Sequence, residues 1–132
     1  MIAIYSSDLE IDVSGTLLEL QAISEAITTF ANSEDLLLSI PANQLADPAP
    51  YDLALPELVF TKANGAIQVT LSKNNALIVS GSGDNLIILA SYFLFPQDSL
   101  NGHHAHFEYF PGVDHVAEDA IPLIITVNEF GS

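Results

Sequence analysis

The residues with the clearest capacity for chemistry are histidines, and all four lie in the last third of the 132-residue chain. His104 and His106 are two positions apart. Because side chains alternate between the two faces of a strand, both imidazoles should project to one side, roughly 7 Å apart. Two imidazoles so placed can bind one zinc ion, with Glu108 or His115 as a third ligand. The spacing is therefore compatible with a metal-binding module or a metal-dependent enzyme.

The same histidines have a second interpretation, as the solvent face of a strand over residues 102–110. The opposite face of that strand would carry Ala105, Phe107 and Tyr109 toward the core. In that case the imidazoles are available for contact with a partner protein. The chain has no cysteine, no Gly-x-Ser-x-Gly sequence and no lysine-containing phosphate loop. We therefore expect no catalytic residue and no cofactor.

The charge balance is strongly acidic. Seventeen aspartates and glutamates stand against two lysines and no arginine, which gives a formal net charge of −15. With so few cations to neutralise them, the carboxylates must face solvent, a metal or a partner. Such a surface either keeps an apolar protein soluble or steers a basic partner protein toward it. Nucleic acid and anionic membranes are disfavoured as partners, because both require basic patches.

Some of the acids follow a strand pattern. Residues 8–13 alternate acidic and apolar side chains, which is typical of a half-buried strand. Leu9, Ile11 and Val13 should face the core. The exposed acidic face would carry Asp8, Glu10 and Asp12. These three carboxylates repel one another, and a basic partner surface would relieve that repulsion.

The C-terminal third contains a recognisable motif. Residues 102–112 read GHHAHFEYFPG and residues 121–125 read IPLII. Together they resemble a family of small bacterial immunity proteins from polymorphic toxin systems, the immunity protein thirty-two family. The matching positions are His104, His106, Phe107, Glu108, Tyr109, Pro122 and Leu123. The resemblance implies a short α+β domain that neutralises a toxin, often a nuclease, by binding it directly.

Two helices must position these residues. Apolar side chains from Leu17 to Phe30 recur at helical spacing, and the preceding Ser14-Gly15-Thr16 can cap that helix. A second helix is predicted from Asn85 to about Phe95, with Asp84 as its N-cap. This segment is apolar almost all round, which favours either burial against a sheet and loop or a dimer interface.

The remaining elements are read as strands and loops. Residues 41–56 contain four prolines and predict a long surface loop, ordered by Tyr51 and Leu53. Asn64-Gly65 predicts a hairpin within an antiparallel meander. The strands are expected at 36–40, 58–61, 67–71, 76–80, 102–110 and 121–129. Val13-Ser14-Gly15 and Val79-Ser80-Gly81 each end a strand before a helix, either through internal duplication or as two similar turns.

We therefore expect one α+β domain over residues 1–132, with a mostly antiparallel sheet of about six to seven strands and two helices packed on it. The first residues lack the basic n-region of a signal peptide, and no apolar run reaches the length of a membrane span. The absence of cysteine is compatible with a reducing compartment. A cytoplasmic protein is expected.

These observations favour a protein that neutralises a cationic toxin domain by direct binding through an acidic surface. The expected contacts are Asp8, Glu10, Asp12, His104, His106 and Glu108. Two alternatives remain open at this point. One is metal binding by His104 and His106, and the other is a non-catalytic homodimer formed through residues 85–95.

Overall fold

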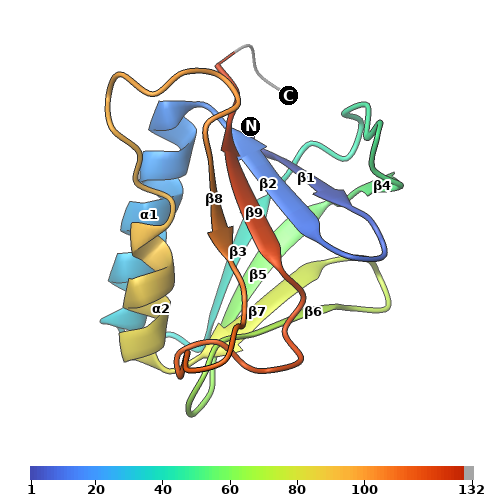
Figure 1. Cartoon of the computed structure of the whole chain (residues 1–132). Coiled ribbons are helices and arrows are strands. Elements are labelled where there is room, and N and C mark those ends of the chain that lie inside the picture. The colour runs from blue at the N-terminus through green and yellow to red at the C-terminus, as the bar shows by residue number, and fades with distance from the viewer. Residues whose placement is uncertain (130–132) are drawn as a thin grey trace.

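A computed structural model describes residues 1–129 of the chain. Its two helices, α1 (Leu17–Ala31) and α2 (Gly83–Ser91), pack against each other on one side of the molecule, and the strands occupy the other side (Figure 1). The strands are β1 (Ala3–Ser6), β2 (Ile11–Gly15), β3 (Leu37–Pro41), β4 (Leu53–Ala54), β5 (Glu57–Lys62), β6 (Gln68–Leu71), β7 (Leu77–Gly81), β8 (His104–Phe107) and β9 (Leu123–Val127).

The described strands form two mixed sheets rather than one. Sheet A has the order β4-β1-β2-β9-β8, and sheet B has the order β3-β5-β7-β6. Each sheet contains one parallel pair, β2 with β9 and β5 with β7, and its other pairs are antiparallel. The α+β class and the mostly antiparallel pairing are confirmed. The nine strands within residues 1–129 exceed the predicted six to seven.

The two halves of the chain repeat the same plan. Each half runs hairpin, helix, then a second antiparallel pair: β1-β2-α1-β3-β5 and β6-β7-α2-β8-β9. The registers agree as well, because Ile11 pairs with Leu123 in the first parallel pair and Leu77 with Leu58 in the second. The halves exchange strands, so that each sheet joins the hairpin of one half to the second pair of the other. The Val-Ser-Gly segments therefore occupy equivalent places.

The helices begin at the predicted turns. Thr16 caps α1 in a capping box, where its hydroxyl accepts from the Glu19 N–H and the Glu19 carboxylate accepts from the Thr16 N–H. The N-cap of α2 is Ser82, and the predicted cap Asp84 lies in the first turn instead. This helix ends at Ser91, so the predicted extension to Phe95 is wrong.

Two predictions about strands are also wrong. The segment 8–13 is a strand only from Ile11, because residues 7–10 form the turn of the β1–β2 hairpin and leave Leu9 exposed. The turn at Asn64-Gly65 does not close a hairpin, since β7 lies between β5 and β6. Instead, the Gly65 carbonyl accepts from the Ser82 N–H and from the Asn85 side chain at the start of α2. Strands β5 and β6 each pair with β7 instead of with each other, so the long-range pairing outweighs the local turn preference of Asn64-Gly65.

The proline-rich segment 41–56 is ordered against the outer edge of β1. Tyr51 stacks on Tyr5 with ring centroids 5.9 Å apart, and Leu53 begins β4, which pairs with β1. The prediction that Tyr51 and Leu53 order this loop is confirmed. Within it, Leu55 is fully buried and donates its N–H to the Ile4 carbonyl.

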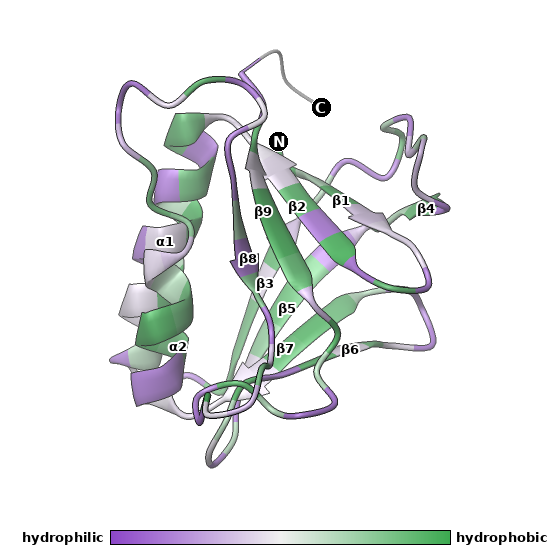
Figure 2. Cartoon of the chain, viewed as in Figure 1, coloured by the Kyte–Doolittle hydropathy of each residue, from purple (hydrophilic) through white to green (hydrophobic). Residues whose placement is uncertain are grey.

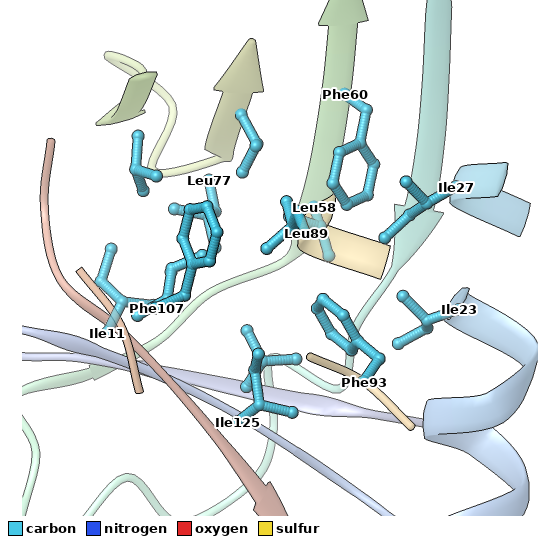
Figure 3. Packing of buried hydrophobic residues seen from close by; sticks show 14 of the residues in the cluster. Ile11, Ile23, Ile27, Leu58, Phe60, Leu77, Leu89, Phe93, Phe107 and Ile125 are labelled. Atoms are coloured by element: carbon cyan, nitrogen blue, oxygen red, sulfur yellow. The ribbon is translucent and has the colours of Figure 1, made fainter. Parts of the chain in front are cut away.

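The core lies between the helices and the inner faces of both sheets. Phe60, Phe93 and Phe107 are among its largest fully buried side chains (Figure 3). Colouring by hydropathy shows apolar residues along β5, β7 and β9, whereas β8 carries two hydrophilic histidines (Figure 2).

Candidate functional site

The outer face of sheet A brings together side chains from four adjacent strands. Pairing runs across β1, β2, β9 and β8, and residues directly opposite each other lie on the same face of a sheet. One row consists of Tyr5, Asp12, Ile124 and His106, and the neighbouring row contains Ser14, Thr126 and His104. Together with Glu10 and Tyr51, the polar members other than the buried Ser14 define what we call the sheet A face: Tyr5, Glu10, Asp12, Tyr51, His104, His106 and Thr126.

Asp12 lies at the centre of the sheet A face and is half-buried rather than exposed. The Tyr51 hydroxyl lies 3.5 Å from its Oδ2, at the long limit of a hydrogen bond. Its Oδ1 is buried, and no donor within residues 1–129 reaches it. The expected row of three solvent-exposed acids is therefore not formed.

The surroundings of Asp12 favour its protonated form. Burial is the main cause and raises the pKa of this carboxyl, and the nearby charge of Glu10 adds to the effect. The polar side chains of Thr126 and Tyr51 and the proximity of His104 lower the pKa of Asp12, in the opposite direction. The pKa values of Tyr5 and Tyr51 are also raised, first by burial and then by the charge of Asp12. Negative charge is thus concentrated beside two aromatic rings.

The two histidines of β8 are exposed neighbours on this face. The ring centroids of His104 and His106 are 5.0 Å apart with an interplanar angle of 76°. His104 Nδ1 lies 3.0 Å from the carbonyl oxygen of Gly102, close enough for a hydrogen bond in the tautomer that carries a proton there. The prediction that both side chains share one solvent-facing side of a strand is confirmed.

A third metal ligand is not brought to this pair. His115 packs against the Phe107 ring, on the core side of β8, with centroids 5.8 Å apart. Glu108 is exposed beyond the end of β8. Across residues 1–129, no group of three or more potential metal ligands comes together. The proposed contribution of His115 is contradicted by its position on the opposite face.

The remaining predicted contact residues, Asp8 and Glu10, lie at the margin of the sheet A face. Asp8 is exposed in the β1–β2 turn, whereas Glu10 is close enough to Asp12 and Tyr51 to raise the pKa of both. Sequence reasoning missed Tyr5, Tyr51 and Thr126. Because Ile2 and Ile4 share one face of a strand, the sequence could have placed Tyr5 on the opposite, outward face. The stacking of Tyr51 on Tyr5 depends on a long-range contact, which the sequence does not reveal.

Aromatic and imidazole side chains around a carboxylate suit protein recognition. Tyrosine is enriched at protein–protein interfaces because its ring supplies contact area and its hydroxyl supplies a hydrogen bond. A lysine or arginine from a partner would find Asp12 and Glu10 beside the paired rings of Tyr5 and Tyr51.

No protein-family model matches the chain. No curated protein and no solved structure matches it either. The similarity of residues 102–112 to the immunity protein thirty-two family therefore stays a prediction. Within residues 1–129, neither helix has the length and apolar character needed to cross a membrane.

Replacing Asp12 with asparagine is expected to raise the free energy of unfolding at pH 7 by a few tenths of a kcal/mol to about 1 kcal/mol. The substitution removes a desolvated negative charge and keeps an oxygen that can accept from Tyr51. Urea unfolding at pH 7 measures the difference. The exposed turn variant Asp8→Asn is the matched control and should change stability by less than about 0.5 kcal/mol.

The sign of the pH dependence follows from the raised pKa of Asp12. Between its unfolded and native pKa values, the native state binds more protons than the unfolded state, so stability falls as pH rises. The contribution of Asp12 is fully present below the unfolded pKa and is lost as pH rises through the native pKa. The Asp12→Asn variant should lose this negative slope. A variant less stable than the parent, with the slope retained, would contradict the assignment.

Proposed function

We propose that this protein binds and neutralises a basic protein through its acidic surface, in the way that an immunity protein blocks a toxin domain in the cytoplasm. The observation that carries the proposal is the lack of internal charge compensation. Among residues 1–129, the single ion pair joins the Met1 ammonium to Glu19, although all seventeen acidic residues lie in this range. The other carboxylates have no cationic side chain to neutralise them.

The two lysines do not change this balance. The Lys62 ammonium donates to the Ser33 carbonyl and lies 4.9 Å from the centroid of the Phe30 ring. Lys73 is exposed in the β6–β7 turn. Complementary charge speeds the encounter of two proteins and disfavours wrong partners. A cationic toxin domain is the class of partner that these carboxylates would select, and the sheet A face supplies aromatic anchors for it.

The test is to capture the partner with tagged protein from a lysate of the native host and to measure its affinity at rising salt. We expect a basic polypeptide whose binding weakens with salt, because exposed charges are screened. Glu10→Lys should weaken binding about tenfold, or about 1.4 kcal/mol. The matched control Glu118→Lys makes the same charge change at an exposed position outside the sheet A face.

Recovery of no basic polypeptide would refute the proposed function. If Glu10→Lys and Glu118→Lys weaken the binding of a basic partner equally, the proposed function stands, but the sheet A face is not the contact site. The captured protein should also lose its own activity when bound, because neutralisation is part of the proposal.

A further inference from the structure

The edge strands are β4 and β8 in sheet A, and β3 and β6 in sheet B. The two-residue strand β4 belongs to the segment that covers β1. The outer edge of β1 receives N–H groups from Asn43, Asp52 and Leu55, at 2.7–2.9 Å from carbonyl oxygens of β1 and the residue before it. The outer edge of β6 is covered in the same way by residues 115–121, through the bridge between Ile67 and Val116. Within residues 1–129, no strand or bridge pairs with the outer edges of β3, β8 and the two-residue β4.

The backbone of β3 offers hydrogen-bonding groups at its open edge. The Ala42 N–H donates to the Pro56 carbonyl, and bonded pairs alternate along an antiparallel ladder. Leu38 and Ile40 therefore exchange bonds with β5, whereas Leu37 and Ser39 direct their N–H and C=O groups outward. At the next outward position, Pro41 has no N–H to offer. The edge can accept a short strand over Leu37–Ser39.

The surface beside this edge is apolar and hollowed. Leu36 and Leu37 are 74% and 60% exposed, although large apolar side chains gain free energy from burial. Two hollows of about 420 Å³ each run between α1 and β3 and share Ala22 and Ala26 on the helix. The small side chains of these alanines leave room for the side chains of an added strand.

The two hollows together form a groove between α1 and β3, and the charge around this groove selects the partner that can bind there. Glu25 and Asp35 line one of the hollows. Glu57 of β5 accepts from the Ser39 hydroxyl at 2.7 Å, on the face of sheet B opposite to Leu38 and Ile40. The ammonium of Lys62, the nearest lysine, is turned to the Ser33 carbonyl. A second copy of the chain is a poor occupant, because pairing two β3 strands would bring two acidic surfaces together and lose a donor at each Pro41.

We propose that the open edge of β3 binds an extended segment of a basic protein as an added strand. Apolar residues of that segment lie over Leu37, Ala22 and Ala26, and its lysines or arginines reach Glu25 and Asp35. Main-chain bonds supply affinity and side-chain pockets supply selectivity in this mode of recognition. The inference rests on the proposed function, since it assigns a binding surface for the same class of partner.

The probe is a synthetic heptapeptide of alternating lysine and valine, titrated into the isotope-labelled full chain and followed by amide chemical shifts. We expect the shifts to concentrate at residues 36–41 and 22–29. Leu37→Lys should weaken binding at least about tenfold. Leu45→Lys is the matched control, because Leu45 is 90% exposed in the segment 41–56. A peptide N-methylated at every amide should bind at least about tenfold more weakly, since it has no N–H group left to donate to β3.

The edge inference fails if the shifts map to the sheet A face, if the N-methylated peptide binds equally well, or if no binding occurs. These failures differ from a failure of the proposed function. A native basic partner whose affinity falls with Glu10→Lys and is unchanged by Leu37→Lys overturns the edge inference alone. Recovery of no basic partner from the native lysate refutes the proposed function itself.

Discussion

Truncating Phe60 to alanine should lower the free energy of unfolding by about 3–5 kcal/mol. Phe60 is fully buried at the centre of sheet B, where it lies near Ile27 of α1 and Leu89 of α2 (Figure 3). The substitution removes the ring from a site lined by both helices and leaves a cavity that these elements cannot close. Urea unfolding measures the loss.

The matched control is Phe110→Ala, because Phe110 is 60% exposed in the segment between β8 and β9. It should change stability by less than about 0.5 kcal/mol. A loss below about 1 kcal/mol for Phe60→Ala would contradict the described core, because a fully buried phenylalanine contributes more than that. Equal losses for the two variants would contradict it as well.

Replacing Gly81 with alanine should destabilise the fold by about 1–3 kcal/mol. An added Cβ at this position would lie 2.5 Å from Ile67 Cδ1 and 3.2 Å from Ile67 Cα. The side-chain atom can rotate away, but the backbone atom cannot, so the segment before β6 would have to shift. Thermal or urea unfolding of the variant measures the cost.

The repeat supplies a matched control, Gly15→Ala, at the equivalent end of β2. There the nearest atom to an added Cβ is Ile2 Cγ2 at 3.1 Å, and no backbone atom is among the three nearest contacts. We expect the Gly15 variant to be the more stable of the two. The reverse order would show that the close approach of β7 to Ile67 is not a constraint.

Local patterns predicted the elements better than their arrangement. Helix α1 and its Thr16 cap could be predicted because both depend on residues close in sequence. The hairpin prediction at Asn64-Gly65 failed because it used a turn preference alone, whereas β7 enters between β5 and β6 from later in the chain. The exchange of strands between the halves has no local signature beyond the two Val-Ser-Gly segments.

The candidate site was predictable in part for the same reason. The period of two placed His104 and His106 on one face, but the contact of Asp12 with Tyr51 joins residues 39 positions apart. Counting charges in the sequence predicted an acidic surface without cationic neighbours. It could not show which parts of that surface also carry exposed apolar side chains. The open edge of β3 could not be found from sequence, because edges are defined only after the sheets are assembled.

The exchange of strands between the two halves has a consequence during synthesis on the ribosome. Strand β2 is central in sheet A, yet its parallel neighbour β9 begins at Leu123, more than one hundred residues after Ile11. While the nascent chain emerges, the first hairpin keeps one edge unpaired until residues 123–127 have been made. Strand edges that remain unpaired in incompletely folded chains promote aggregation. The many uncompensated carboxylates would keep such unfinished chains apart through mutual repulsion, so the acidity that we propose as the basis of partner binding would also protect the protein before it has folded.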